Sequence, residues 1–586
     1  MTTAGLEAVL PLPVVIPISG AVASPLLARL SKRLPLIVSL LAMAGSTACM
    51  ALLAPRVYSG HVLVHYMGNW VPVGGKALGI AFGADPFGLT YGLAVGVVGA
   101  VLLLFTLSDM GHLGGRELGG YTCLFLLLLA ALIGTALTAD LFNTFVWFEV
   151  AALASYGLTG FFLERPLALE AAFKLLVLTT VAGFLVFIGA SLLYSDHGAL
   201  NLGQLHVALA GHVTTTDLVA LGLLVAGFAT KLGLVPFHGW LPDAHTAAPG
   251  PVSALFSGLM VNLGVVVIAR LALQVFGAGG ARPLLGLLVV LGVVSALTGA
   301  VLALAQDDLK RLLAYDTISQ MGVLAVGLGT GSAAGEAGMT YHLISHALFK
   351  SLLFLCAGAI VTASGMTKLS EMGGLARRRP GLAVAFVIGV MAIAGIPPLN
   401  GYVSVGLIHK ALEDGHQPGV LALMLVAQVV TVAALARAAW LAFFRRREEP
   451  LDHLEPLRPG MRVAFGTLAA GCVAFGVLPF SILRHVAGAA AGALLSGGGL
   501  TYAHDVLHGG GVVPRLAVSF TYLDPVELLT VAATTLAGLA LAAVYIRRPE
   551  PAPIRALRAL HNGSANDYAA YGVVGVIATV ATMVLR

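Results

Sequence analysis

Lysine and glutamate side chains stand inside apolar segments, where an unpaired charge is costly. Lys231 lies within LVAGFATKLGLVPFHGW, and Glu149 lies within LFNTFVWFEVAALASYGL. A lone ammonium in a bilayer costs roughly 2.5–3.5 kcal/mol on insertion scales. Glu149 therefore needs a proton or a partner, which could be Lys174 or Lys231 on a neighbouring span. Separating such a pair inside a membrane can release a proton, whereas a static pair would only fix helix packing.

Two histidines and a lysine recur at helical spacing in a further apolar segment. His342, His346 and Lys350 in YHLISHALFK occupy positions i, i+4 and i+8. They share one helical face and extend over about 12 Å along the axis. Imidazole exchanges protons near neutral pH, so such a row can pass a proton through intervening waters. The alternatives are a polar contact between helices or a pair of histidine metal ligands, but the sequence places no carboxylate beside the pair.

Two of the lysines also have ordinary explanations. Lys174 follows Glu170 by four residues, which is the spacing of an i,i+4 ion pair near a membrane edge. Lys231 lies five residues before Pro236 and could extend its ammonium to an interface. A proline at that position also breaks the helix, and a hydratable break beside a lysine suits a proton carrier.

Composition indicates a membrane protein with many spans. The chain of 586 residues is 58% hydrophobic and 10% charged, whereas soluble domains carry about 25% charged residues. With about 20 residues for each span, we expect an all-α polytopic protein with about 14 to 16 transmembrane helices. Basic residues sit in short loops, which argues against nucleic-acid binding. The four cysteines lie far apart without metal-ligand spacing, so we expect neither a cofactor nor a metal.

The apolar runs place the spans and their orientation. Sixteen candidate spans lie near residues 9–28, 34–54, 86–107, 119–138, 140–162, 168–194, 217–237, 250–274, 283–305, 313–330, 337–363, 381–408, 418–444, 461–482, 525–546 and 568–585. Loops after the odd-numbered spans carry most of the lysine and arginine residues. The positive-inside rule then predicts these loops in the cytoplasm and both termini on the outer side.

Internal breaks suggest how the spans are organised. Pro236 interrupts the seventh span, and Pro397-Pro398 interrupts the twelfth, five spans later. This spacing predicts two five-span repeats, roughly spans 4–8 and 9–13, each with one broken helix. Inverted repeats with broken helices are a common transporter design. We accordingly divide the chain into N-terminal helices (1–115), a first repeat (116–275), a second repeat (276–445) and C-terminal helices with an outer loop (446–586). We also expect a hairpin within 55–85 and an amphipathic surface helix over 484–495.

Several ordered motifs resemble one family. KLGLVPFHGWLPDAHTAAPGPVSALFSGLM, DDLKRLLAYDTISQMG, YHLISHALFKSLLFLCAG and GIPPLNGY are similar to the proton-conducting antiporter-like subunits of respiratory complex I, Mrp-type sodium/proton antiporters and membrane-bound hydrogenases. The resemblance covers about residues 60–410. It implies a fourteen-helix core with inverted repeats and broken seventh and twelfth helices, within a larger complex.

The same resemblance assigns functional residues and shows two departures. It implies proton-transfer roles for Glu149, Lys231, His342, His346 and Lys350. Many members carry a lysine in the eighth span where this chain has Asn262, and a lysine or glutamate after the PPLNG-like break where it has Val405. His409, one turn beyond Val405 on the same face, is the candidate substitute, and Lys174 is a further candidate.

The expected function is proton translocation by a multi-pass subunit of a bacterial-type inner-membrane complex. Complex I-like, hydrogenase-like and Mrp-type cation/proton antiporter complexes all remain open, as does the choice between protons alone and sodium/proton exchange. Expected partners are other integral membrane subunits and peripheral redox subunits. We expect no redox chemistry in this chain, so any NADH:quinone oxidoreductase activity would belong to the assembled complex. The alternative is a non-pumping structural subunit that anchors a redox or inorganic-carbon uptake partner.

Overall fold

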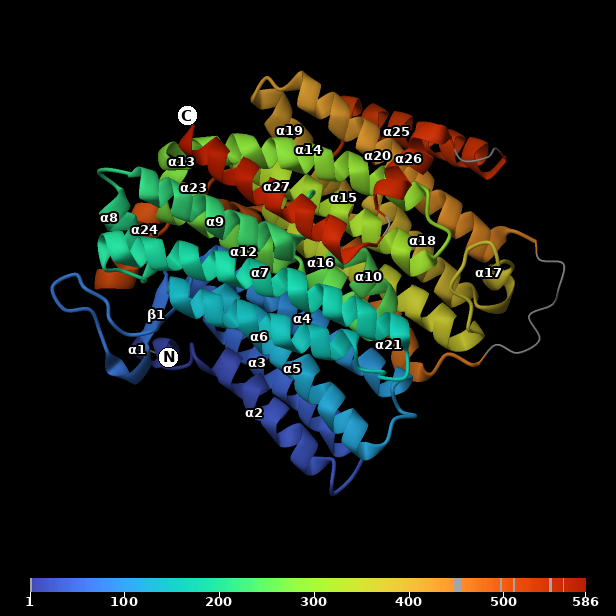
Figure 1. The fold of residues 1–586 in the computed structure, drawn as a ribbon, viewed down its shortest axis with the longest axis horizontal. Coiled ribbons are helices and arrows are strands. Elements are labelled where there is room, and N and C mark those ends of the chain that lie inside the picture. Colours follow the sequence, from blue (N-terminus) through green and yellow to red (C-terminus); the bar gives the residue numbers. More distant parts are fainter. Residues whose placement is uncertain are drawn as a thin grey trace.

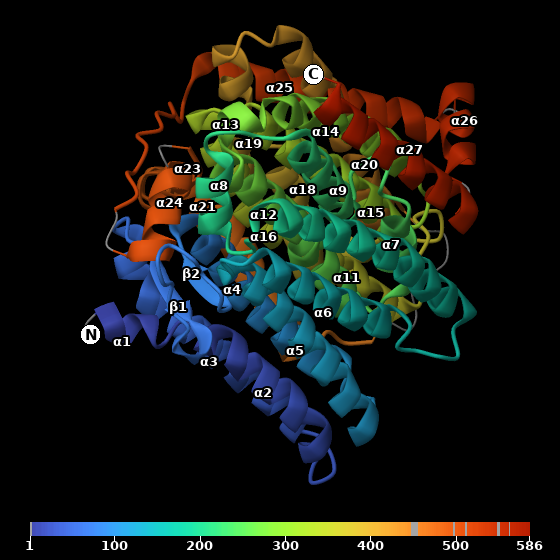
Figure 2. The ribbon, with the colours of Figure 1, turned by 60° about the vertical axis from the view of Figure 1, so that its left-hand side comes forward.

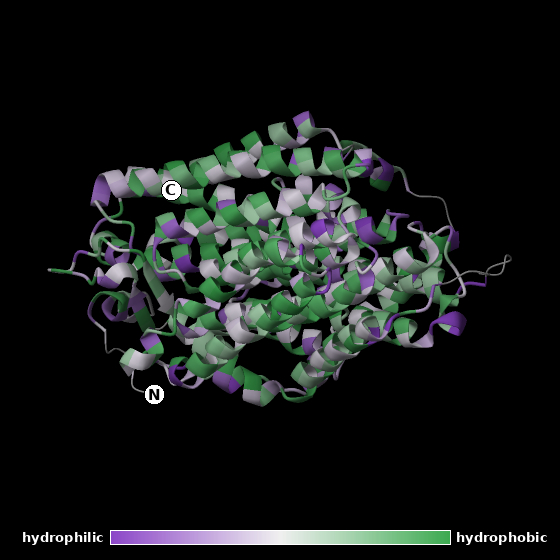
Figure 3. Cartoon of the chain, turned by 90° about the horizontal axis from the view of Figure 1, so that it is seen from below, coloured by the Kyte–Doolittle hydropathy of each residue, from purple (hydrophilic) through white to green (hydrophobic). Residues whose placement is uncertain are grey.

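Long apolar helices make up the protein, because a backbone in lipid must form its hydrogen bonds internally. A computed structural model describes residues 3–446, 455–495, 498–509, 512–547, 551–561 and 563–585. Within these ranges, fifteen helices are long and apolar enough to cross a membrane, which confirms the expected all-α polytopic class. Hydrophobic colour dominates the helices, and hydrophilic segments gather mainly in the loops and helix ends (Figure 3).

The spanning helices follow the predicted runs closely. Fourteen of them contain α2 (Leu12–Leu27), α3 (Leu34–Tyr58), α4 (Pro86–Asp109), α5 (Gly115–Leu137), α6 (Leu141–Thr159), α7 (Pro166–His197), α9 (Thr215–Leu232), α14 (Arg282–Leu304), α15 (Leu309–Gly329), α16 (Ala333–Ser364), α20 (Pro418–Ala439), α21 (Pro459–Val477), α25 (Pro525–Arg547) and α27 (Ala565–Val584). The other, Gly250–Val275, contains α11 (Gly250–Leu255) and α12 (Asn262–Ala269).

Shorter elements connect or cap these helices. They are α1 (Thr3–Glu7), α8 (Leu202–Leu209), α10 (Trp240–Ala247), α13 (Gly277–Gly280), α17 (Leu375–Arg378), α18 (Pro380–Ile393), α19 (Asn400–Asp414), α22 (Pro479–Ile482), α23 (Gly488–Leu495), α24 (Gly498–His508), α26 (Ala552–Leu560), β1 (Leu63–Tyr66) and β2 (Ala81–Ala84). The strands pair antiparallel, with Leu63 opposite Ala84, so the hairpin expected within 55–85 is present. The run 381–408 is divided between α18 and α19.

The helices pack side by side around α16. The N-terminal helices α2 and α3 lie on one flank and α25 lies on the opposite flank (Figures 1 and 2). From residue 335 to residue 360 every side chain of α16 is buried, as expected for a helix at the centre of a membrane bundle. The last helix, α27, packs against α9 and α14.

Two interruptions of the helical backbone are stabilised by side-chain hydrogen bonds. The chain leaves helical conformation between α9 and α10 and again between α18 and α19. At the first interruption, Trp240 Nε1 donates to the Thr230 carbonyl at 2.7 Å, and Ser295 Oγ accepts from Val235 N–H at 2.9 Å. At the second, Gln428 Nε2 donates to the Ala394 carbonyl at 3.2 Å. Irregular backbone survives at membrane depth only where protein or water supplies such partners. The five-helix repeats and the domain boundaries stay predictions.

The expected surface helix over 484–495 is wrong. The residues of α23 before Leu495 are buried, and the helix packs against α4 and α16. Its sequence, GAAAGALL, is rich in small residues. Small side chains allow helices to approach closely, so this segment lies within the bundle.

Candidate functional site

Lys231 occupies the last turn of α9, directly before the first interruption. Gly233 ends the helix in a left-handed conformation with φ +78°, which glycine adopts without strain. The Lys231 side chain is fully buried, and its Nζ has no hydrogen-bond partner among the described residues. Nζ lies 5.5 Å from the centre of the Phe148 ring. The ammonium therefore sits in a water-poor environment with an aromatic face as its near neighbour.

Glu149 is the carboxylate whose charge acts on Lys231. The two groups interact electrostatically, but no carboxylate oxygen of the described residues lies within hydrogen-bonding distance of Lys231 Nζ. Glu149 is half-buried on α6, next to Phe148. Its carboxylate packs on α7 where Gly183 leaves space for it. The arrangement keeps the pair coupled but separated, and a small movement of either group changes their interaction energy.

Lys174 lies elsewhere and does not pair with Glu149. Its Nζ forms ion pairs with Glu170 at 2.6 Å and with Asp243 at 3.0 Å. Lys174 therefore forms the expected i,i+4 ion pair with Glu170 and a second ion pair with Asp243 of α10. Arg311 also approaches Asp243, at 3.4 Å.

These charges line a cavity of about 1030 Å³. Its charged and titratable lining residues are Asp109, His112, Glu164, Arg165, Glu170, Lys174, Asp243, Asp308, Lys310 and Arg311. The Lys310 side chain, in the first turn of α15, is buried. Its Nζ donates to the carbonyls of Thr246 and Ala248 at 3.1 and 2.5 Å. A cation at the C-terminal end of α10 is favourable because the last carbonyls lack helical partners.

The His342, His346 and Lys350 row lies along α16 as predicted, and all three side chains are buried. The rings of His342 and His346 are 6.4 Å apart between centroids. His342 Nδ1 is 3.0 Å from Ser404 Oγ on α19. Neither ring nitrogen of His346 has a hydrogen-bond partner among the described residues. No hydrogen bond joins His342, His346 and Lys350 to one another, so a proton relay along this row would need intervening waters.

Lys350 has an acidic partner that the sequence interpretation missed. Its Nζ is in contact with the carboxylate of Asp316 on α15, and both side chains are fully buried. Nζ also donates to the Leu313 carbonyl at 3.1 Å. A buried ion pair survives when further hydrogen bonds satisfy its members. Asp316 lies inside the predicted span 313–330, so the cost of an acid in lipid was a signal that could have identified it.

His245 links the first interruption to the α16 row. It lies on α10, fully buried, with its Nδ1 2.8 Å from the Leu241 carbonyl of its own helix. Its Nε2 has no hydrogen-bond partner among the described residues. The ring contacts Trp240 beside the interruption and Phe354 on α16, with centroid separations of 5.9 and 5.6 Å. The sequence placed His245 between two spans, where no apolar run singled it out.

The two departures from the family pattern have different surroundings. Asn262 Nδ2 donates to the Gly258 carbonyl of the preceding turn at 2.9 Å, so its amide nitrogen is engaged locally. Val405 and His409 line one small cavity. His409 Nδ1 lies 3.1 Å from Glu527 Oε1. Glu527 is at the start of α25, and sequence reasoning did not connect it with His409, because that contact depends on packing between helices far apart in the chain.

Comparisons with known proteins agree with this architecture. Residues 138–431 match the family model described as NADH:quinone oxidoreductase/Mrp antiporter, TM. NADH-quinone oxidoreductase subunit N of Desulforudis audaxviator is 33% identical over 458 residues, 77% of this chain and 89% of that protein. A Na(+)/H(+) antiporter subunit of Alkalihalophilus pseudofirmus is 35% identical over 378 residues, 63% of this chain and 73% of that protein.

Solved structures give the same result. A chain of the Mrp complex from Dietzia sp. DQ12-45-1b has a TM-score of 0.77 at 26% identity, and a chain of the membrane-bound sulfane sulfur reductase, an archaeal respiratory membrane complex, has 0.78 at 28%. Each comparison covers 86% of this chain and 100% of the other. The order of spans, the two interruptions and the sequence matches lead to one conclusion: the chain belongs to the NADH:quinone oxidoreductase/Mrp antiporter transmembrane family.

Proposed function

We propose that this chain moves protons across the membrane as an antiporter-like subunit of a multi-subunit complex. The observation that carries the proposal is the buried Lys231 ammonium, which has no hydrogen-bond partner among the described residues and is coupled to Glu149. Ionisable groups inside spanning helices are costly, and proteins retain them mainly along ion and proton routes. The relatives are named as subunits of an NADH-quinone oxidoreductase and a Na(+)/H(+) antiporter.

The proposed mechanism is electrostatic. A change at a partner subunit alters the distance between Glu149 and Lys231, which changes how firmly Lys231 holds its proton. Lys231 then gives up the proton towards His245 on α10. From there the proton reaches the Lys350–Asp316 pair and the His342 and His346 row, with waters between the groups. Lys174 belongs to the entrance on the predicted cytoplasmic side.

The setting of the protein follows from the same proposal. The chain lies in the inner (cytoplasmic) membrane, with both termini on the outer side and the cavity beside Lys174 facing the cytoplasm. Its partners are other integral membrane subunits, together with peripheral redox subunits if the complex is respiratory. Any redox reaction occurs in those partners.

Transport by the purified intact complex in proteoliposomes tests the function. A potassium diffusion potential set by valinomycin drives protons, and an enclosed pH dye reports their movement, so no partner reaction is needed. Lys231→Ala and Glu149→Gln should each abolish transport while leaving assembly intact. Lys368→Ala is the matched control, because Lys368 is a surface lysine, 59% exposed, paired with Glu371. Full transport in both pathway variants would refute the proposal.

Sodium/proton exchange is the second candidate, favoured by the Na(+)/H(+) antiporter relatives from Alkalihalophilus pseudofirmus and Bacillus subtilis. A sodium gradient applied to the same vesicles separates the two: exchange predicts proton movement that depends on sodium. The non-pumping alternative, a structural anchor, rests on Asn262 and Val405. It predicts that Lys231→Ala leaves the complex with wild-type coupling.

A further inference from the structure

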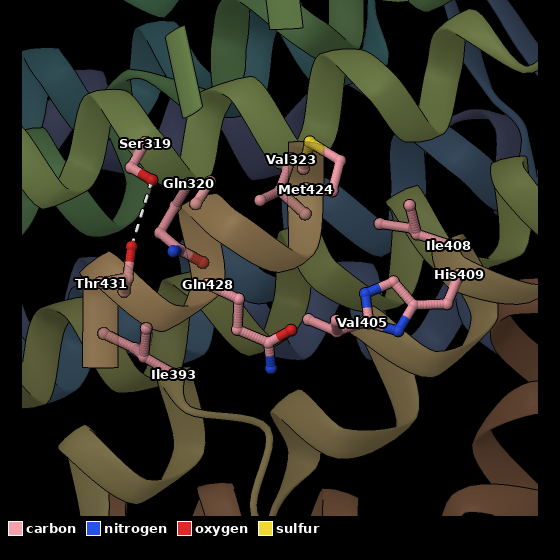
Figure 4. A pocket seen from close by; sticks show the side chains of 11 residues that line it. Ser319, Gln320, Val323, Ile393, Val405, Ile408, His409, Met424, Gln428 and Thr431 are labelled. Atoms are coloured by element: carbon pink, nitrogen blue, oxygen red, sulfur yellow. Dashed lines mark hydrogen bonds between the residues drawn. The ribbon is translucent and has the colours of Figure 1, made fainter. Parts of the chain in front are cut away.

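Val405 stands where many members of the family carry a lysine or glutamate, so the outer half of the proposed proton route lacks that charged residue. A cavity at this position offers another path by which a proton could leave. Val405 and His409 of α19 line a cavity of about 30 Å³ with residues of α15 and α20. Its polar lining is Ser319, Gln320, His409, Gln428 and Thr431 (Figure 4). A space of this size holds a water molecule, and a buried water needs two to four polar partners. The lining supplies them.

The inner end of this cavity adjoins the Lys350–Asp316 pair. Asp316 and Gln320 are four residues apart on α15, so they share a helical face and are about 6 Å apart along the axis. Gln320 reaches the cavity, while Asp316 contacts Lys350. Figure 4 shows the amide groups of Gln320 and Gln428 beside the cavity, with the imidazole of His409 at its other end.

The outer end is closed by an ion pair between helices. His409 Nδ1 lies 3.1 Å from Glu527 Oε1 and 3.4 Å from Oε2. The His409 side chain is 5% exposed and that of Glu527 is 13% exposed. Glu527 is in the first turn of α25, on the predicted outer side. One member of the pair therefore faces the cavity, and the other has some access to solvent.

We propose that His409 and Glu527 form the proton exit of this subunit, a function that rests on the proton transport proposed above. The protonated imidazole of His409 gives its Nδ1 proton to the Glu527 carboxylate, so one N–H bond breaks and one O–H bond forms. Glu527 then releases that proton to the outer water. The neutral ring then turns Nδ1 towards the cavity and takes a proton from water there, so one O–H bond breaks and one N–H bond forms, and the ring turns back with its starting charge. Each cycle therefore moves one proton from the cavity to the outer water.

This assignment adds a residue from outside the region that the family model matches. The match ends at residue 431, and α25 begins at Pro525. α25 packs against α20, which places its first turn beside α19. The exit is therefore assembled from α15, α19 and α20 of the matched region together with α25, which makes α25 part of the transport path.

The vesicle assay with a diffusion potential tests the exit directly. Glu527→Gln keeps the size of the side chain and its contact with His409 but removes the proton-accepting carboxylate. It should slow proton movement at least tenfold, and His409→Gln should do the same. The double variant should lose no more than either single one, because the two groups act as one unit. Glu527→Asp, which retains a carboxylate, should recover part of the rate.

Glu413→Gln is the matched control, since Glu413 is an exposed carboxylate on the same end of α19. Assembly and thermal unfolding of every variant are measured in parallel; an effect that appears only as lost assembly, and that Glu527→Asp does not relieve, overturns the exit. Wild-type rates in Glu527→Gln and His409→Gln, with Lys231→Ala inactive, also overturn the exit but leave the proposed function standing. An active Lys231→Ala overturns the proposed function itself.

Discussion

The carboxylate of Glu149 occupies the space that a side chain at Gly183 would need. A methyl group at position 183 would overlap Glu149 Oε1, so the absence of a side chain on α7 sets where the carboxylate sits relative to Lys231. A substitution at Gly183 can therefore change the distance between the Glu149 and Lys231 charges without altering either residue.

Gly183→Ala should therefore weaken the coupling. We expect the displaced carboxylate to change the Glu149–Lys231 interaction by about 1–2 kcal/mol, which alters a two-state population by roughly 5- to 30-fold. Proton transport in vesicles should fall between wild type and Glu149→Gln. Gly120→Ala is the control, because a methyl group there would meet nothing within 4 Å. Equal rates in the two alanine variants would contradict this role for Gly183.

Asp316→Asn should destabilise the protein, because it leaves the Lys350 ammonium buried without its counter-charge. Breaking a buried pair by removing one partner costs about 3–5 kcal/mol. Thermal unfolding of the purified protein measures this loss. The double variant Asp316→Asn/Lys350→Met should regain stability and still fail to transport protons. A double variant no more stable than Asp316→Asn would show that the pair is not the source of the effect.

His245→Phe separates the packing role of the imidazole from its proton chemistry. The phenyl ring keeps the contacts with Trp240 and Phe354 but has no nitrogen. A positioned proton carrier contributes roughly 10²–10⁴-fold to a transfer step, so we expect transport to fall by at least about tenfold with assembly unchanged. Phe256→Leu, which alters another ring in contact with His245, is the comparison, and a similar loss there would point to packing alone.

The folded protein should lose stability at low pH because of His561, which lies in the loop before α27. Burial is the main cause that lowers the pKa of His561 below its ordinary value of 6.5, and the nearby Arg311 charge adds to it. The folded protein therefore holds His561 neutral, and the stability it contributes is present above pH 6.5 and is lost as the unfolded chain binds the proton at lower pH.

The melting temperature measures this effect. Between about pH 7.5 and about pH 5.5 it should fall more in the wild type than in His561→Gln, since glutamine does not titrate in this range. His212→Gln, which changes an exposed histidine, should retain the wild-type pH response. The same response in all three proteins would rule out His561 as its source.

The sequence predicted the spans and most of the candidate site because one physical cost governs both. Apolar length defined the helices, and charges inside those helices identified Glu149, Lys231 and the α16 row. Asp316 met the same criterion and was overlooked. His245 and Glu527 could not be found in this way. His245 reaches α16 only because the interruption after Lys231 turns α10 inward, and Glu527 meets His409 only through packing of α25.

The position of α27 determines where neighbouring subunits can dock. It covers α9 beside the first interruption, where a side chain at Gly575 would collide with Pro236 and Phe237, and it also contacts α14. α27 therefore covers this flank of the bundle. Under the proposed mechanism, a neighbouring subunit that acts on Lys231 must contact another flank, which restricts the side on which such a subunit can dock.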